Sequence, residues 1–141
     1  VEVSREEAEW SYRHSMFDAA RYVVVAATLE LTPADPAGIR ARMDELTAKR
    51  EAKQPIDMPS AGSTFKRPEG HFAAALIDQA GLKGLAIGGA QVSTKHTGFV
   101  VNVDDATSAD VQALIAEVQR RVLESSGVAL EPEVRMWGRE A

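Results

Sequence analysis

The sequence predicts an α+β fold in two layers, a small mixed sheet packed by about three helices, with a strand-containing tail at the N-terminus. Two patterns indicate it. Apolar residues recur at helical spacing in several segments, and short runs rich in β-branched residues lie between them, bounded by glycine or proline. A chain of 141 residues with 45% hydrophobic residues is long enough for one core and too short for two substantial domains.

The first strong pattern is the apolar run Arg21–Leu31, which ends at a Thr-Pro pair. Its β-branched and aromatic residues predict a strand, and its continuous apolar middle predicts burial on both faces. Asp35 and Pro36 then resemble an N-cap followed by proline at the first helical position. We expect a helix from there to about Lys53, with one apolar side formed by Ile39, Met43 and Leu46.

The segment between Pro59 and Pro68 gathers small residues, a hydroxyl and two cations. The prolines have a fixed φ and favour extended neighbours, so this segment is predicted to be a defined loop or short strand. Gly62 leaves room for another group to approach the backbone. The segment is compatible with an ordinary polar turn, and equally with a seat for an oxygen-rich anion formed by Ser63, Lys66 and Arg67.

Three further elements are expected between His71 and Val103. A short helix is expected over His71–Ala80, with Phe72, Leu76 and Ile77 on its apolar side and Gly81 at its end. Glycines within Leu82–Thr94 predict a short strand interrupted by a bend or bulge. Phe99–Val103 is a second strand, in which Asn102 is expected to face solvent or a ligand because its neighbours are apolar.

The helix pattern at Thr107–Ser125 is the clearest in the chain. Thr107 and Asp110 form a capping box, Gly127 follows the C-terminus, and one apolar stripe is predicted to pack on a sheet. Val128–Trp137 is the expected last strand, restricted to an edge or irregular pairing by Pro132. Residues two apart in a strand share a face, so Glu133 and Arg135 are expected on one face.

Composition and spacing exclude several classes. The net charge of −5, with cations interspersed among carboxylates, gives no attraction to nucleic acid. No apolar run is long enough to cross a bilayer, and no signal peptide pattern is present at the start, so a soluble protein is expected. The absence of cysteine fits a reducing cytoplasm and excludes thiolate chemistry. Neither a P-loop nor a dinucleotide fingerprint occurs, and no metal site is expected from the scattered histidines His14, His71 and His96.

Ser63 and Lys66 also match the S-x-x-K motif of acyl-transfer enzymes. That chemistry needs both side chains on adjacent turns of one helix, and Pro68 and the glycine argue against a helix here. A Ser/Lys hydrolase is therefore a minor alternative, and the residues taken one by one indicate only an α/β domain with a candidate oxyanion-binding loop.

Four motifs together carry a stronger signal. The segments YRHSMF at Tyr12, PSAGSTFKRP at Pro59, GLKGLAIGGAQVSTKHTGFVVN at Gly81 and LEPEVRMWG at Leu130 occur in this order over nearly the whole chain. In this order they resemble the C-terminal part of the UDP-N-acetylenolpyruvoylglucosamine reductase family, also called UDP-N-acetylmuramate dehydrogenase. The resemblance divides the chain into residues 1–35, the tail of an FAD-binding domain, and residues 36–141, a substrate-binding domain.

The resemblance implies reduction of the enolpyruvyl ether of UDP-N-acetylglucosamine enolpyruvate by NADPH through bound FAD, in peptidoglycan synthesis in the cytoplasm. It assigns proton donation to Ser63, and stabilisation of the enol-like intermediate and substrate carboxylate to Arg13 and Glu133. Arg135 is placed to approach the flavin. Weaker candidates for binding the UDP-sugar are Lys53, Lys66, Arg67, His96 and Asn102, of which Arg67 stands where many family members have asparagine.

The same resemblance implies that the glycine-rich FAD-binding region of the family is missing from this chain. We therefore expect the chain alone to hold little FAD and to be inactive, with FAD bound mainly by the missing region. A non-catalytic module that binds a UDP-sugar is the alternative from another class. An exposed edge at residues 23–25 is expected to pair with a second copy of the chain.

Overall fold

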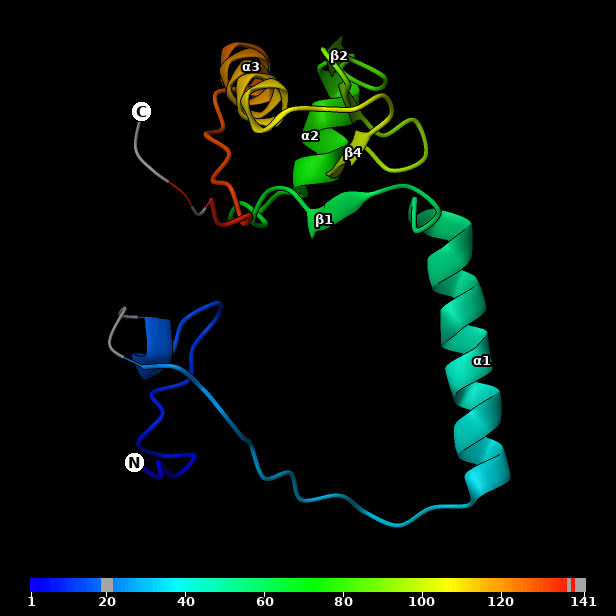
Figure 1. Ribbon diagram of the computed structural model, residues 1–141, viewed down its shortest axis with the longest axis vertical. Coiled ribbons are helices and arrows are strands. Elements are labelled where there is room, and N and C mark those ends of the chain that lie inside the picture. The colour runs from blue at the N-terminus through cyan, green and yellow to red at the C-terminus, as the bar shows by residue number, and fades with distance from the viewer. Residues whose placement is uncertain (19–21, 137, 139–141) are drawn as a thin grey trace. The chain divides into compact units, whose positions relative to one another are not determined.

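The computed structural model describes residues 1–18, 22–136 and 138 (Figure 1). The chain divides into two compact units, Val1–Pro36 and Ala37–Ala141.

In the first unit the chain forms turns. A capping box joins Ser4 and Glu7: the Ser4 N–H donates to Glu7 Oε2 (2.9 Å) and the Glu7 N–H donates to Ser4 Oγ (3.3 Å). Only one turn follows, closed by the Ala8 N–H on the Ser4 carbonyl (3.1 Å). An isolated bridge joins Ser11 and His14, and the 3₁₀ helix η1 covers Met16–Asp18.

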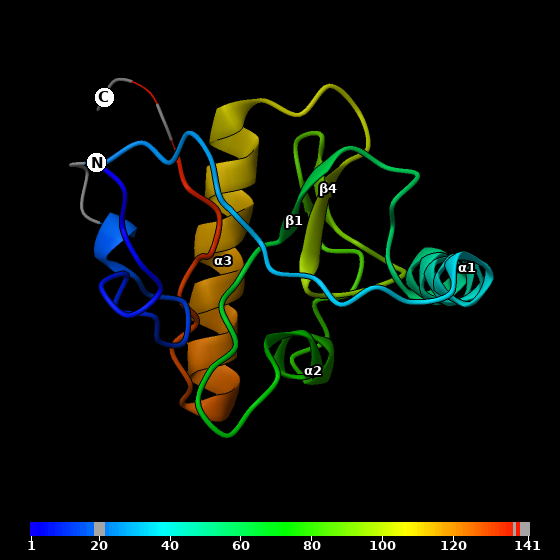
Figure 2. The ribbon, with the colours of Figure 1, turned by 90° about the horizontal axis from the view of Figure 1, so that it is seen from below.

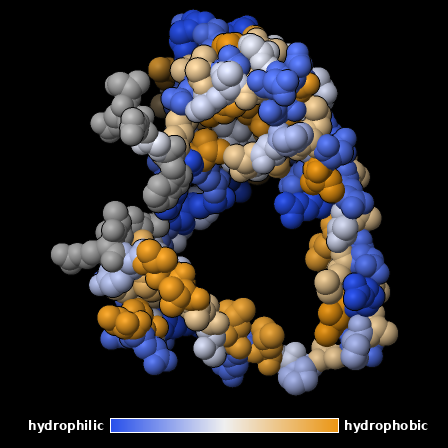
Figure 3. Space-filling model, viewed as in Figure 1, coloured by the Kyte–Doolittle hydropathy of each residue, from blue (hydrophilic) through white to orange (hydrophobic). Residues whose placement is uncertain are grey.

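The strand predicted over Arg21–Leu31 is wrong for the residues that the structure describes. Residues 22–35 contain no strand, and the three valines expected to be buried are 87%, 61% and 92% exposed at Val23, Val24 and Val25. Figure 3 shows hydrophobic side chains on the surface of this unit. A β-propensity becomes a strand only when a second strand satisfies the backbone N–H and C=O groups, and the described residues supply none here. Arg21 lies outside the described residues.

Helix α1, Pro36–Lys53, confirms the predicted start and end. Glu45 is the centre of its exposed charge pairs: Lys49 Nζ contacts one carboxylate oxygen and Arg42 Nη1 donates to the other at 2.7 Å. None of the 18 residues, all of them described, is buried. The apolar side of Ile39, Met43 and Leu46 is about half exposed.

A four-stranded sheet forms the centre of the second unit. Its strands are β1 (Ser60–Ser63), β2 (Ala86–Ile87), β3 (Ala90–Val92) and β4 (Phe99–Asn102), in the order β1-β4-β3-β2. Strands β2 and β3 are the interrupted strand predicted over Leu82–Thr94, now a tight hairpin with Gly88 at φ 53° in its turn. The α+β class is confirmed, but every strand pair of this described sheet is antiparallel, whereas a mixed sheet was expected.

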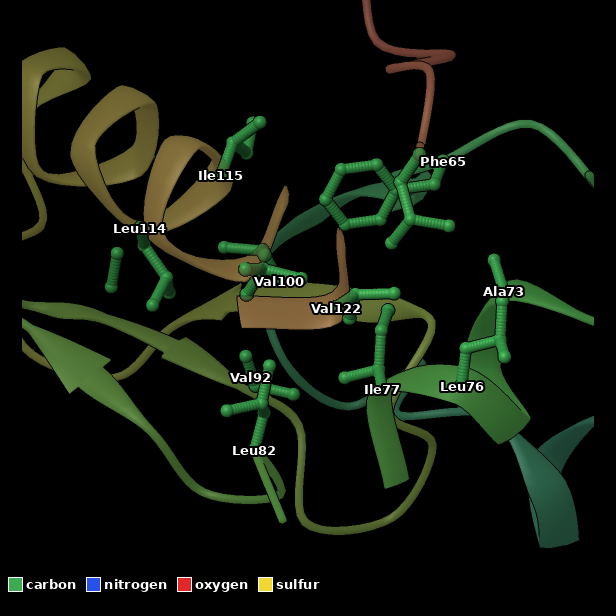
Figure 4. Packing of buried hydrophobic residues seen from close by; sticks show 13 residues of the cluster. Phe65, Ala73, Leu76, Ile77, Leu82, Val92, Val100, Leu114, Ile115 and Val122 are labelled. Atoms are coloured by element: carbon green, nitrogen blue, oxygen red, sulfur yellow. The ribbon is translucent and has the colours of Figure 1, made fainter. Parts of the chain in front are cut away.

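Helices α2 (Ala73–Gln79) and α3 (Ser108–Ser126) cover the sheet, with α3 packed against β2, β3 and α2 (Figure 2). Leu76 and Ile77 of α2 are buried as predicted, but Phe72 is 60% exposed because it lies at the N-cap position, before the buried side begins. Figure 4 shows the core between these elements, which also contains Phe65, Leu82 and the stripe Leu114, Ile115, Val118 and Val122.

The capping box of α3 is confirmed. The Thr107 N–H donates to Asp110 Oδ2 (2.9 Å), the Asp110 N–H donates to Thr107 Oγ1 (3.1 Å), and Gly127 ends the helix at φ 72°. The hydrogen bonds from the Thr107 backbone and side chain hold the pKa of Asp110 below its ordinary value. The folded state is thus stabilised by an ionised Asp110.

We expect Asp110→Asn to lower the melting temperature at pH 7. Because the pKa of Asp110 is lower in the folded state, its contribution is present above the unfolded pKa, about 4, and is lost as the pH falls through the folded value. Circular dichroism melts from pH 7 to pH 3 should therefore show the two proteins converging below about pH 4. A difference that stays constant down to pH 3 would contradict this role of the charge.

The strand predicted over Val128–Trp137 is also wrong within the described residues, since only an isolated bridge between Phe65 and Pro132 forms. Two backbone hydrogen bonds flank this bridge, both of 2.8 Å: the Lys66 N–H donates to the Glu131 carbonyl, and the Glu133 N–H donates to the Thr64 carbonyl. Pro132 thus occupies the position of the pair that needs no N–H donor, which is why proline fits there and why pairing is short. Trp137 lies outside the described residues.

Candidate functional site

Ser63 is the last residue of β1 and is exposed. Ser60 pairs with Val101 and Ser63 with Phe99, so three steps along β1 match two steps along β4. The extra residue is a β-bulge, and Gly62 within it has a φ of 87°. Bulges change the direction in which the following side chain points, and here the residue after the bulge is the serine.

Glu133 lies next to this strand end although it is 70 positions further along the chain. Its N–H donates to the carbonyl of Thr64, the residue that follows Ser63. Glu133 itself is half-buried. The structure therefore places the backbone of Glu133 beside the residue that follows Ser63, so two of the three predicted catalytic residues belong to adjoining segments.

The two cations of the loop already contact other groups of the protein. Lys66 Nζ forms an ion pair with Glu131, its cross-strand neighbour. The guanidinium of Arg67 lies 4.0 Å from the centre of the Phe72 ring, and its Nε donates to the His71 carbonyl (3.3 Å). Both side chains remain partly or fully exposed, so they can still meet an anion from solvent.

The S-x-x-K alternative fails on this geometry. Ser63 ends a strand and Lys66 pairs with the segment at Glu131, so the two residues do not lie on adjacent turns of a helix. The Lys66 ammonium is instead paired with the Glu131 carboxylate.

His96 and Asn102 are placed near the same strands. His96 Nδ1 accepts the Gly98 N–H (3.2 Å). The His96 ring packs edge-to-face with the ring of Phe99, the register partner of Ser63, with 5.1 Å between the ring centroids. Asn102 ends β4, and its Oδ1 accepts the Ala106 N–H (3.0 Å). The expectation that Asn102 faces only solvent or a ligand was wrong for this oxygen, because it closes the loop before α3.

Arg135 is exposed and lies on a groove of about 820 Å³ beside β1, β4 and α3. The groove is apolar along Val111, Ile115 and Val134 and carries a few polar groups. The other described residues that line it are Pro59, Ser60, Ala61, Thr64, Val100, Val101, Asn102, Ser108, Gln112, Met136 and Gly138.

Two predicted site residues belong to neither the sheet nor the C-terminal segment of the second unit. Lys53 is exposed at the last position of α1. Arg13 belongs to the first unit, where it is exposed, has a φ of 57° and lies with its guanidinium 5.9 Å from the centre of the Tyr12 ring. A positive φ is uncommon for an arginine.

Sequence reasoning missed Thr64, which is 2% exposed and makes three backbone contacts at the centre of the cluster. The signal that could have found it is the glycine two residues earlier in a predicted strand, which often marks a bulge. Within the described residues no group of three His, Cys, Asp or Glu side chains is arranged to hold a metal ion. Nor is any helix in that part of the chain long and apolar enough to span a membrane.

The fold and the site define a small α+β domain that presents a serine, a carboxylate and several cations around one irregular strand end, an arrangement suited to an oxygen-rich anionic ligand. The model of the C-terminal domain of UDP-N-acetylenolpyruvoylglucosamine reductase matches residues 54–137. The chain belongs to this family.

Curated relatives agree with the family model. The chain is 52% identical over 141 residues to the UDP-N-acetylenolpyruvoylglucosamine reductase of Exiguobacterium sibiricum, covering all of this chain and 46% of that protein. It is 52% identical over 138 residues to the same-named protein of Levilactobacillus brevis, covering 98% of this chain and 45% of the relative. The chain thus spans a little under half the length of these relatives.

A solved structure supports the fold. The crystal structure of UDP-N-acetylenolpyruvylglucosamine reductase (MurB) from Thermus caldophilus matches with a TM-score of 0.63 and 38% sequence identity. The match covers 77% of this chain and 38% of the other. At this identity the likeness supports both the fold and the family.

Proposed function

We propose that residues 36–141 are the substrate-binding domain, and residues 1–35 the tail of the FAD-binding domain, of a cytoplasmic enzyme that reduces UDP-N-acetylglucosamine enolpyruvate to UDP-N-acetylmuramate. The observation that carries the proposal is the exposed Ser63 at the end of β1 with Glu133 bound to the next residue. The family membership gives the reaction class.

Ser63 donates a proton to carbon in this proposal. FAD, when bound and reduced by NADPH, would supply hydride chemistry at the methylene carbon of the enolpyruvyl group, which leaves the adjacent carbon to be protonated by a residue of this chain. An alcohol is a weak acid, so it protonates carbon only opposite a basic enol-like carbon and where positive charge is near. Arg13 has the fork geometry that binds the substrate carboxylate, and Glu133 stabilises the enol-like intermediate through its hydrogen bonds.

The residues that the structure describes could hold only part of the FAD cofactor. The groove beside β1 carries Arg135 and small polar groups, and a dinucleotide with two phosphates needs more donors than these. We therefore propose that FAD and NADPH are bound mainly by the part of the parent protein that this chain lacks, with Arg135 contacting the flavin.

The UDP-sugar is proposed to meet the remaining polar residues around Ser63. The surface pair of Lys66 and Glu131 contributes little stability, so a diphosphate can compete for the lysine. His96 has its Nε2 side left for a ligand, since Nδ1 accepts the Gly98 N–H. The full set is Lys53, Lys66, Arg67, His96 and Asn102.

The test uses this chain with the N-terminal half of the Exiguobacterium sibiricum relative, produced separately. We expect the chain alone to hold little FAD and to show no NADPH oxidation with the substrate, and the mixture to be active. Stoichiometric flavin bound to the isolated chain would contradict the division of labour. Halves that associate without any activity would contradict the reductase proposal and leave a non-catalytic UDP-sugar module, which calorimetry with UDP-N-acetylglucosamine would detect.

The exposed segment Tyr22–Leu31 is proposed to pair with a strand of the missing half. Its valines have the composition of a buried strand and lie in solvent. In the isolated chain, residues 23–25 of this segment are expected to pair with a second copy of the chain. Sedimentation velocity should then show association that rises with concentration and disappears when the other half is added. A monomer at every concentration would contradict this pairing.

A further inference from the structure

Thr64 is the point at which two sets of backbone hydrogen bonds meet. On one side its N–H donates to the Gly98 carbonyl (2.8 Å), which joins it to the chain entering β4. On the other side its carbonyl accepts the Glu133 N–H (2.8 Å), which joins it to the C-terminal segment. Its side chain is 2% exposed, so these contacts are shielded from water.

The hydroxyl of Thr64 replaces a backbone acceptor that the bulge displaces. The Val100 N–H points at β1, where the extra residue at Gly62 breaks the regular register, and it donates instead to Thr64 Oγ1 (3.0 Å). A buried N–H without an acceptor is costly, so the hydroxyl is what allows the bulge to sit against β4. The bulge in turn determines the direction of Ser63.

We propose that Thr64 is a positioning residue that fixes Ser63 and Glu133 beside each other. Thr64 directly follows Ser63 in the chain, so its anchoring restricts where Ser63 lies. The Thr64 carbonyl accepts the Glu133 N–H, so the same anchoring restricts Glu133. Leu130 of the C-terminal segment is buried and its carbonyl accepts Gln119 Nε2 (2.8 Å), so the backbone bonds of residues 64–66 are a second anchor, the one next to Glu133. The proposal rests on the proposed function of Ser63 and Glu133.

The first arm of the test measures the link itself in this chain. Thr64→Val keeps the shape of the side chain and removes the acceptor, whereas Thr64→Ser retains it. We expect amide hydrogen exchange, followed by NMR, to be at least about tenfold faster at Glu133 in Thr64→Val relative to the Val118 amide in the same protein, and to be restored in Thr64→Ser. Val118 is fully buried in the middle of α3 and reports the general stability of the unit.

A matched control separates this link from a general loss of stability. Gly127 has a φ of 72°, and an added Cβ there would meet no atom within 4 Å, so Gly127→Ala strains the end of α3 without touching the site. It should change the exchange of Glu133 and Val118 by the same factor. If Thr64→Val also changes both equally, Thr64 does not specifically hold the C-terminal segment and the proposal is wrong.

The second arm measures the reaction in the mixture with the other half. Thr64→Val is expected to lower kcat for substrate reduction by at least about tenfold, with the rate of flavin reduction by NADPH unchanged and with Thr64→Ser close to wild type. Faster exchange at Glu133 with an unchanged kcat would overturn the proposal while leaving the proposed function standing. A wild-type mixture without activity would overturn the proposed function, and the exchange measurement would still decide whether Thr64 holds Glu133.

Discussion

Ser63→Ala is expected to lower the rate of substrate reduction in the reconstituted mixture by about 10² to 10⁴, the range typical of a lost general acid. The reason is chemical: without the hydroxyl, the carbon next to the reduced methylene has no positioned proton donor. Reduction of the flavin by NADPH does not involve that carbon and should keep its rate. Rapid mixing that follows the two half-reactions separately measures the difference.

Ser60 provides the matched control for this variant. It is also an exposed serine of β1, three residues earlier, and its Oγ accepts the Gly62 N–H (3.4 Å). Ser60→Ala should therefore leave substrate reduction within about twofold of wild type. Because Ser60 lines the groove beside Arg135, a change confined to flavin reduction would report on that groove and not on proton donation. An equal loss of substrate reduction in Ser60→Ala and Ser63→Ala, or a loss of both half-reactions in Ser63→Ala, would show that the cause is a disturbed β1 strand and not the missing Ser63 hydroxyl.

The parts of the fold that the sequence predicts well are those specified by neighbouring residues. Pro36 at a helix start, the Thr107 and Asp110 box, and Gly127 after α3 all act within one helical turn. Such signals need no knowledge of the rest of the chain. For the same reason the short helix α2 and its end before Gly81 followed from local pattern.

The two wrong strands fail for a common reason. A strand is completed by a partner that is distant in sequence, and neither Arg21–Leu31 nor Val128–Trp137 finds a continuous partner among the described residues. Pro132 indicated irregular pairing in the second segment, but nothing in the valines of the first indicated that the described residues would offer them no partner strand. Hydrophobic pattern alone therefore predicts where a strand can form and not whether it does.

The candidate site shows the same division. Ser63 and Glu133 were assigned from motifs, and the structure adds that they are neighbours, through a hydrogen bond between residues 64 and 133. The role of Thr64 could not be predicted, because it depends on the register between β1 and β4, which is shifted by the bulge at Gly62. Gly62 could have signalled the bulge, but the residue type at position 64 carried no signal of its own.

Gly89→Ala is expected to destabilise the second unit by at least about 3 kcal/mol, as an overpacked substitution against rigid backbone does. A Cβ on Gly89 would lie 1.8 Å from the Asp104 carbonyl oxygen and 2.5 Å from the Ala106 nitrogen. Neither atom belongs to a side chain that could move away. The melting temperature measured by circular dichroism should fall by more than about 10 °C.

Gly81→Ala is the control for the effect of glycine itself. Gly81 has a φ of 68° and no atom within 4 Å of an added Cβ, so alanine there meets only the left-handed strain, about 1 to 2 kcal/mol. Gly89 has the reverse problem, since its backbone is compatible with alanine and its surroundings are not. The contact that excludes the Cβ is also a link, because the Val103 N–H donates to the Gly89 carbonyl (2.9 Å) and so fixes the β2–β3 turn to the loop that follows β4. If the melting temperature of Gly89→Ala is no lower than that of Gly81→Ala, the loop at residues 104–106 can move to accommodate the added Cβ. The contact between the β2–β3 hairpin and this loop is then not what holds Asn102 and the Thr107–Asp110 capping box in place.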